Sequence, residues 1–330
     1  MKNGWMAIAL AAVTALGTGT AAFADSTEAT TEAEVQHPSG LKIGCAVQTL
    51  SNQVWAQQMD AITKDSKADG NSFTVVDCQE NANTQMDQLE NFITSGMDVI
   101  IVQPVDPDAI EDVCKQALDA GIEVVCWDEE MTNSSFNWVI KNYDLGCAIG
   151  EQAAEFIADK FSNDEEVETV VLGYPQTPIL LERENGIIDT LKEKAPNAKI
   201  VANQPAIDTT EGLNAMETIL QANPDVKVVC TIGGGGAAGA NEALKGYYGD
   251  KVPDDVGIFS TDLTDECIAS MQNGEFNRSC IAITGNAYVC GDVVYDLAMQ
   301  YAAGVKLDHD VYRDLVPVTP ENLDEMIAHD

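Results

Sequence analysis

Three consecutive carboxylates follow an apolar run in residues 122–131, which read IEVVCWDEEM. Asp128, Glu129 and Glu130 carry side chains that bind metal ions, act as acid and base, or accept hydrogen bonds from hydroxyl groups. A solvated loop is the interpretation without chemistry, and it fits Glu130 best. Asp128 comes directly after a strand-like run, where open parallel sheets bind their ligands, so we expect it to contact a ligand. For Glu129 both interpretations stay open.

Polar side chains follow the other strand-like runs as well. Amides and carboxylates dominate, while histidine, serine beside histidine and paired lysines are absent from these positions. Such a set suits hydrogen bonding to a polyhydroxylated molecule and suits nucleophilic catalysis poorly. The positions are Gln48-Thr49, Gln79-Glu80, Gln103-Pro104, Asp128-Glu129, Tyr174-Pro175, the Gly233–Gly236 run and Thr261-Asp262.

The elements that must position these residues are short β-branched runs that alternate with stretches of helical length. Apolar spacing predicts helices over residues 84–95 and 107–120. Strands buried on both faces and separated by helices indicate the α/β class with doubly wound parallel sheets. Four such units precede about residue 142 and four follow it, which favours two lobes over one wide sheet. The runs are LKIGCAV, SFTVVDC, DVIIVQP, IEVVCWD, ETVVLGYP, AKIVANQ, VKVVCTI and VGIFSTD.

Residues 1–24 have the pattern of a cleaved secretory signal. A lysine precedes an apolar run from Trp5 to Leu16, and small residues then lead to Ala22-Phe23-Ala24. The apolar run is shorter than the roughly 20 residues that span a bilayer. A buried N-terminal helix is the alternative. Residues 25–40 are polar and acidic, which predicts a flexible leader, and we expect a periplasmic or extracellular protein.

The chain is strongly acidic, with 54 aspartates and glutamates, 17 lysines and arginines, and a formal charge of −37. Such a surface repels phosphate groups and anionic lipids, so we expect no nucleic acid or membrane surface as partner.

None of the nine cysteines forms a C-x-x-C pair, and five lie in apolar, strand-like runs. We interpret most of the cysteines as free buried thiols.

Two enzymatic alternatives remain. The segment from Gly234 to Gly239 has the G-x-G-x-x-G spacing between a strand and a helix, and Asp262 ends the next strand, as in a dinucleotide site. An exported NAD-dependent oxidoreductase would follow, although no proton-transfer residue accompanies it. A small-residue turn that lets the helix pack closely on the strand is the structural interpretation.

Paired carboxylates also occur in glycoside hydrolases. No calcium or zinc ligand spacing is present, so we expect no metal and no other cofactor.

The ordered series of motifs resembles the type I periplasmic binding proteins of the ribose and galactose branch, which serve sugar ABC importers. The resemblance covers residues 41–319. It is carried by IGCAVQTLSNQVWAQQMDAI, SGMDVIIVQPVDPDAI, GIEVVCWDEE, ERENG, NQPAIDTTEGLNAMETILQANPDVKVV and VGIFSTD.

The resemblance implies two doubly wound parallel-sheet lobes joined by a three-strand hinge. It places the N-terminal lobe at residues 41–141 and 285–312, and the C-terminal lobe at 142–284 and 313–330. The ligand-binding residues that it implies are Asn52, Trp55, Gln103, Asp128, Glu129, Arg183, Gly233 and Asp262. It also implies a monomer that delivers a sugar or polyol to an ABC permease by closing around it, and that is not an enzyme.

Three departures from the ribose-binding pattern bear on the ligand. Glu129 stands where ribose binders carry an arginine, Val54 replaces an aromatic residue, and the Gly233–Gly236 run replaces a polar pair. Arg183 supplies one positive charge against Asp128, Glu129 and Asp262, which leaves the site near −2. This charge disfavours sugar acids and sugar phosphates and suits neutral sugars, polyols, amino sugars or other cations.

Overall fold

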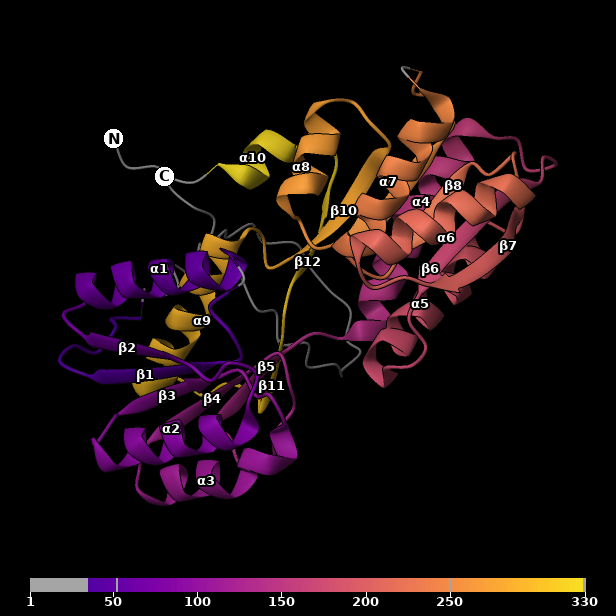
Figure 1. Cartoon of the computed structure of the whole chain (residues 1–330). Helices are drawn as coiled ribbons and strands as arrows, with labels where there is room; N and C mark the ends of the chain where they lie inside the picture. The colour runs from indigo at the N-terminus through magenta and orange to yellow at the C-terminus, as the bar shows by residue number, and fades with distance from the viewer. Residues whose placement is uncertain (1–34, 52, 250, 329–330) are drawn as a thin grey trace, which may run out of the picture. The chain divides into compact units, whose positions relative to one another are not determined.

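The computed structural model describes residues 35–51, 53–249 and 251–328. Two six-stranded sheets with helices on both faces form the fold, which confirms the predicted α/β class and doubly wound architecture (Figure 1). The predicted signal, residue 52 and most of the predicted leader lie outside the described residues. His37, at the end of that leader, contacts Asp69 and Asp296 at 2.8 Å each, so the folded part begins before residue 40.

The first sheet has the strand order β11-β5-β4-β3-β1-β2, and all neighbouring strands run parallel. Buried side chains of α1 and α9 pack on one face, and those of α2 and α3 pack on the other. The strands are β1 (Lys42–Val47), β2 (Ser72–Asp77), β3 (Val99–Val102), β4 (Glu123–Trp127), β5 (Phe136–Val139) and β11 (Asp310–Tyr312). The helices are α1 (Gln53–Ala68), α2 (Ala82–Thr94), α3 (Pro107–Asp119) and α9 (Ala287–Ala302).

The second sheet has the order β12-β10-β9-β8-β6-β7, and only β12 runs antiparallel to its neighbour among the described strands. Helices α4 and α5 pack on one face, and α6 and α7 on the other. The strands are β6 (Val167–Gly173), β7 (Ala198–Pro205), β8 (Val228–Thr231), β9 (Gly257–Thr261), β10 (Asn277–Ile283) and β12 (Leu315–Val318). The helices are α4 (Asn142–Lys160), α5 (Pro178–Lys194), α6 (Thr209–Ala222), α7 (Gly234–Tyr248), α8 (Asp265–Gln272) and α10 (Leu323–Ile327).

The chain passes between the two sheets three times, after β5, after β10 and after β11. The connections are joined by backbone hydrogen bonds, from Arg313 N to Val139 O at 2.9 Å and from Thr284 N to Asp314 O at 2.8 Å. Segments far apart in the sequence thereby meet, and the orange α9 and yellow β11 lie among the indigo and magenta elements of the first sheet (Figure 1).

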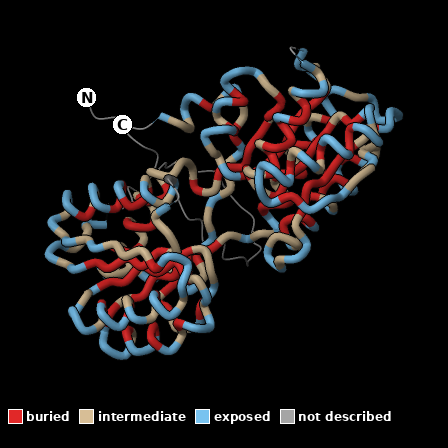
Figure 2. The backbone as a smooth tube through the Cα atoms, in the orientation of Figure 1, coloured by how far each residue is buried: buried red, intermediate tan, exposed pale blue. Residues whose placement is uncertain are grey.

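The buried residues concentrate in the strands and on the inner faces of the helices (Figure 2).

Helices begin where the sequence supplies capping side chains. Asn81, Asp106, Asp208, Thr264 and Asn286 each accept a hydrogen bond from the backbone N–H three residues further on. This bond satisfies a donor that the helix itself leaves unpaired.

The glycine-rich start of α7 serves helix packing. A Cβ at Gly239 would lie 2.3 Å from the Thr209 carbonyl oxygen, and one at Gly236 would lie 3.1 Å from the Ala206 carbonyl oxygen. Gly212 on α6 meets Gly236 in the same way, with the Gly236 oxygen 2.7 Å from an added Cβ. The predicted small-residue contact therefore exists, but its main partner is helix α6 instead of the preceding strand.

All nine cysteines are free, and all of them except Cys147 are buried. This confirms the interpretation of the strand cysteines as small hydrophobic residues. Trp127 and Trp138 are fully buried in the core of the first sheet. Within the described residues, no helix is long and apolar enough to span a membrane.

Candidate functional site

The carboxyl ends of β3 and β4 bring together three of the predicted site residues. Val102 pairs with Cys126 in the parallel register, so Gln103 and Asp128 leave the first sheet at the same edge. The Trp55 ring, from the first turn of α1, lies against the Trp127 ring with centroids 4.8 Å apart and planes at 65°. Trp55 stays partly exposed. The edge thus offers an amide, a carboxylate and an aromatic ring.

Asp128 has a left-handed backbone, with φ of 70°, directly after β4. Aspartate tolerates this conformation better than most residues. Its Oδ1 forms an ion pair with Arg313 Nη1 at 2.5 Å, and its side chain is 26% exposed. The protein thus holds the carboxylate through Oδ1, and the partly exposed side chain can accept hydrogen bonds from a ligand through Oδ2.

Arg313 was not predicted as a site residue. Its guanidinium is 7% exposed and lies over the Trp138 ring, 4.3 Å from the centroid. Nε donates to the Thr284 hydroxyl at 3.3 Å, and Nη2 donates to the Ile283 carbonyl at 3.1 Å. Asp128 and Arg313 are 185 residues apart in the chain, so no local pattern indicates their pairing. The sequence offers one indication of its importance, because arginine is rare in this chain and occurs only three times.

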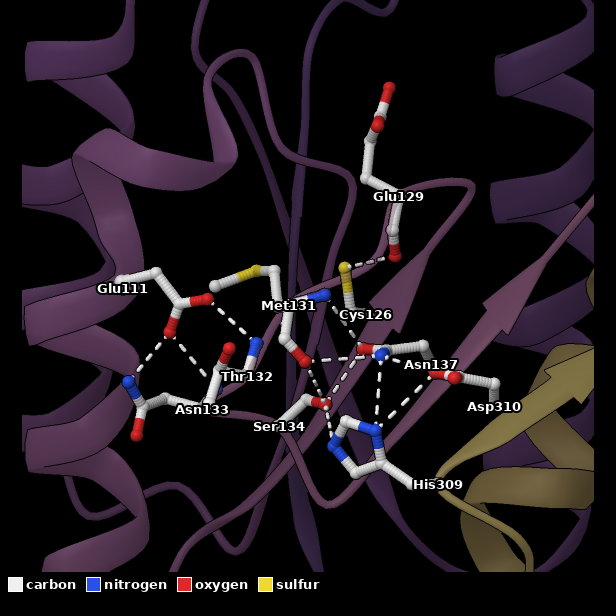
Figure 3. Close-up of polar contacts among 10 residues, drawn as sticks. All are labelled: Glu111, Cys126, Glu129, Met131, Thr132, Asn133, Ser134, Asn137, His309 and Asp310. Atoms are coloured by element: carbon white, nitrogen blue, oxygen red, sulfur yellow. Dashed lines mark hydrogen bonds and ion pairs between the residues drawn. The ribbon is translucent and has the colours of Figure 1, made fainter. Parts of the chain in front are cut away.

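Glu129 is half-buried beside Asp128. Burial raises the pKa of its carboxyl group, and the negative charges of Asp128 and Glu130 raise it further. Its backbone oxygen accepts a hydrogen bond from Cys126 Sγ at 3.0 Å, while its side chain points away from the other residues drawn (Figure 3). The carboxylate is therefore free to contact a ligand, and it is easier to protonate than an exposed glutamate.

The loop between β4 and β5 is fastened on two sides (Figure 3). Glu111 on α3 accepts hydrogen bonds from Thr132 N at 2.7 Å and from Asn133 N at 2.9 Å. Asn137 on β5 accepts from Ser134 Oγ at 2.7 Å and donates to Asp310 Oδ1 at 2.8 Å. These contacts fix the loop that carries Asp128 and Glu129, which limits the conformational entropy that a ligand must remove.

The second sheet contributes Arg183, a buried arginine from α5 that is 8% exposed. Its Nη1 donates to the Ile232 carbonyl at 2.5 Å, and its Nε and Nη2 both donate to Asn142 Oδ1, at 3.2 and 2.7 Å. Burial lowers its pKa, and the charges of Asp262 and Asp128 act in the opposite direction. The sequence did not indicate Asn142, which orients this guanidinium from the start of α4.

Asp262 repeats the geometry of Asp128 at the end of β9, with φ of 66°. Its Oδ2 accepts a hydrogen bond from Gly234 N at 3.2 Å, at the N-terminus of α7. An added Cβ at Gly233 would lie 3.5 Å from the same oxygen. Arg183, Gly233 and Asp262 therefore lie at one edge of the second sheet, with the positive end of the α7 dipole near the carboxylate.

The arrangement is suited to binding hydroxyl groups. Carboxylate oxygens accept from hydroxyls, the Arg183 guanidinium and the Gln103 amide donate, and the Trp55 ring can cover an apolar sugar face. Asn52, the remaining predicted site residue, lies outside the described residues. In the described part of the chain, no three histidine, cysteine, aspartate or glutamate side chains lie together as a metal site would require.

The fold and this strand-end site define a two-lobed binding protein. The chain belongs to the periplasmic binding protein domain family, which its residues 43–306 match. This match confirms the resemblance found in the strand-end motifs. The family is one of binding proteins.

Two kinds of relative illustrate the match. The ribose import binding protein of Bacillus subtilis is 30% identical over 203 residues, which cover 61% of this chain and 65% of that protein. The chain thus spans just under two thirds of that relative's length. The structure of a periplasmic ribose ABC transporter protein from Conexibacter woesei has a TM-score of 0.75 at 18% identity, covering 90% of this chain and 98% of that one.

A solute-binding protein of Bacillus halodurans, solved with bound myo-inositol, has a TM-score of 0.68 at 24% identity. The similarity covers 87% of this chain and 97% of that chain. At these identities, the two solved structures show that the fold is shared and carry no information on the ligand of this chain.

Proposed function

We propose that this protein is the extracytoplasmic solute-binding component of an ABC importer and that it captures a neutral sugar or polyol. The observation that supports this most is the pair of strand-end aspartates. Asp128 and Asp262 each have one carboxylate oxygen held by the protein, by Arg313 and by Gly234 N respectively. The other oxygen of each is open to hydroxyl groups. The family membership supports the same class.

Capture proceeds by closure about the three connections between the sheets, which act as the hinge. The two lobes comprise residues 41–141 with 285–312 and residues 142–284 with 313–330. Ligand first binds at one lobe, and contacts that exist only in the closed state draw the other over it. Micromolar affinity corresponds to about −8.2 kcal/mol, which several charge-assisted hydrogen bonds of roughly 1.5–3 kcal/mol each supply after ordering costs.

The ligand-binding residues of this proposal are Asn52, Trp55, Gln103, Asp128, Glu129, Arg183, Gly233 and Asp262. Residues 1–24 act as a cleaved export signal, and the mature protein is a monomer in the periplasm or outside the cell. Its protein partner is the membrane permease, which recognises the closed form through exposed helices of both lobes.

The enzymatic alternatives have weaker support. A dinucleotide would place its pyrophosphate at the N-terminus of α7, where the Asp262 carboxylate already accepts from Gly234 N and would repel it. The glycines of the G-x-G-x-x-G segment are accounted for by close contact with α6. A glycoside hydrolase needs an acid and a nucleophile across a glycosidic bond, whereas Asp128 and Glu129 are suited to the hydroxyls of a single sugar.

Thermal unfolding of the protein comprising residues 25–330 tests the class. The panel includes D-ribose, D-arabinose, D-allose, myo-inositol, glucosamine, NAD and a chromogenic glycoside. A ligand at 100 times its Kd stabilises the fold by about 2.7 kcal/mol, which raises the midpoint measurably. We expect a shift with a neutral sugar or polyol. A shift with NAD alone, or release of the chromophore, would show that the protein is an enzyme.

A further inference from the structure

We propose that Arg313 is a positioning residue of the ligand site, which orients the Asp128 carboxylate and supplies the positive charge that position 129 lacks. This inference rests on the proposed function and deepens it. Arg313 lies between β11 and β12, far in sequence from every residue that the sequence pattern places in the site.

Arg313 acts through Asp128 and does not itself contact the ligand. Its guanidinium is 7% exposed, and its nitrogens donate to Asp128, Thr284, Ile283 and Cys290. The Trp138 ring covers one face of the group. These bonds use all three nitrogens of the guanidinium, so the group is committed mainly to the protein and above all to Asp128. It binds Oδ1 of Asp128 and thereby fixes the orientation of the whole carboxylate, including Oδ2.

The pairing is reciprocal because each group needs the other. An unpaired buried charge is strongly unfavourable, and the only carboxylate bonded to Arg313 among the described residues is Asp128. A lysine could not replace the arginine, because a single ammonium group cannot reach Asp128, the Thr284 hydroxyl and the Ile283 carbonyl with the fixed fork of a guanidinium. In a chain with 14 lysines and three arginines, an arginine at this position therefore supports a role that needs a guanidinium group.

The charge at the site also follows from this pair. Sequence alone placed one arginine against three acids, which gives −2. With Arg313 included, Asp128 and Asp262 are balanced by two guanidinium groups, and only Glu129 remains. Counted as ionised, the five side chains sum to −1 instead of −2, which weakens the case for a cationic ligand and suits an uncharged polyhydroxylated one.

Arg313 also joins the ligand site to the connections between the sheets. Its backbone N–H donates to Val139 O in the first connection, and its side chain bonds Thr284 and Ile283 in the second. Thr284 has a left-handed backbone, with φ of 63°. A ligand that engages Asp128 is thus linked to all three connections through one residue, Arg313, so the orientation of Asp128 and the geometry of the hinge are coupled.

The test is a double-mutant cycle on binding, measured by titration calorimetry with D-ribose and myo-inositol as probes. The variants are R313M, D128N and R313M/D128N, with R278M as the control. Arg278 is also buried in part and donates to the Val256 and Pro253 carbonyls, away from the site. We expect R313M to raise the Kd at least about 30-fold in the wild-type background, about 2 kcal/mol. In the D128N background we expect less than about a threefold change.

Other outcomes overturn the inference. If R313M leaves the Kd within threefold of wild type, or raises it by the same factor in both backgrounds, Arg313 does not act through Asp128. R278M should lower the unfolding midpoint and leave the Kd unchanged, and an equal loss of affinity in R278M would show that R313M acts through general destabilisation. If R313M does not fold, R313K replaces it and should still weaken binding at least about tenfold. If neither probe binds the wild-type protein, the titrations use the neutral sugar or polyol that stabilises it in thermal unfolding. Absence of binding of every such solute would overturn the proposed function, and this inference with it.

Discussion

Asp128 and Asp262 occupy equivalent positions in the two sheets. Each directly follows the strand that is third in its sheet order, β4 in the first and β9 in the second, and each has a left-handed backbone, with φ of 70° and 66°. Each also has one carboxylate oxygen bound to a protein donor. The two carboxylates differ in their donor, because Asp128 binds a buried guanidinium and Asp262 binds a helix N-terminus.

The left-handed backbone at Asp128 predicts different effects for two substitutions. Both D128A and D128N remove the charge that pairs with Arg313. Asparagine tolerates positive φ, whereas alanine in this region is unfavourable by about 1–2 kcal/mol. We therefore expect D128A to be less stable than D128N by about 1 kcal/mol in urea unfolding. The same difference should separate D262A from D262N, and equal stabilities within either pair would contradict the backbone account.

The environment of Glu129 predicts that ligand binding depends on pH. In the ligand-free protein its pKa is raised by burial and by its acidic neighbours. Hydroxyl groups that donate to the ionised carboxylate stabilise the charged form. Affinity should therefore increase by a few-fold as the pH rises through the raised pKa, above the ordinary 4.5, and then level off. E129Q should remove this dependence in calorimetric titrations, and its persistence would assign it to another group.

Close contact between α6 and α7 predicts opposite effects of two glycine substitutions in α7. A Cβ at Gly239 would lie 2.3 Å from the Thr209 oxygen and 2.4 Å from Leu213 N, both backbone atoms. G239A should destabilise the protein by about 3 kcal/mol or more. Gly246, in the same helix, has nothing within 4 Å of an added Cβ. G246A should stabilise by about 0.5–1 kcal/mol. Loss of stability in both variants would show that the contact is not specific.

Asp65 on α1 predicts that stability changes with pH. Burial raises its pKa to about 6, with further contributions from the charge of Asp292 and a hydrogen bond to it. Because the folded state favours the protonated form, this stabilisation is complete below about pH 4 and is lost as the pH rises through about 6. D65N should therefore be more stable than wild type at pH 7.5, by about 1 kcal/mol since the group is only half-buried.

A control on the same helix separates this effect from a general loss of negative charge. Asp60 lies on the exposed side of α1, so D60N removes one negative charge from the same helix without removing a half-buried carboxyl group. If D60N and D65N alter the profile equally, the dependence reflects the high net charge of the protein and not the Asp65–Asp292 pair.

Eight of the described strands, β1 to β4 and β6 to β9, coincide with the predicted runs, and β5, β10, β11 and β12 were not among them. The run VKVVCTI lies over β8, and GIEVVCWD lies over β4, because both contain four or more consecutive buried residues. The strand β11 has three residues with one buried, and β12 is a partly exposed edge strand that contains Pro317. Neither has enough apolar residues to produce a periodic signal.

The candidate site divides in the same way. Gln103, Asp128 and Asp262 were predictable because they follow buried strands, and parallel strands place such residues at one edge. Arg313 and Asn142 were not predictable, because they act on partners 185 and 41 residues away through contacts that exist only in the folded protein. The estimate of a site charge near −2 was therefore too negative, since it omitted Arg313.

Calorimetric titration of wild-type protein and D128N with the sugar or polyol that stabilises the wild type most is the direct test of the central claim, that Asp128 binds the hydroxyl groups of a captured solute. The account predicts one ligand per chain with a Kd on the order of micromolar, and binding at least about 100-fold weaker in D128N. Titration of D128N with an unchanged Kd, or no binding of any neutral sugar or polyol by the wild type, would contradict it.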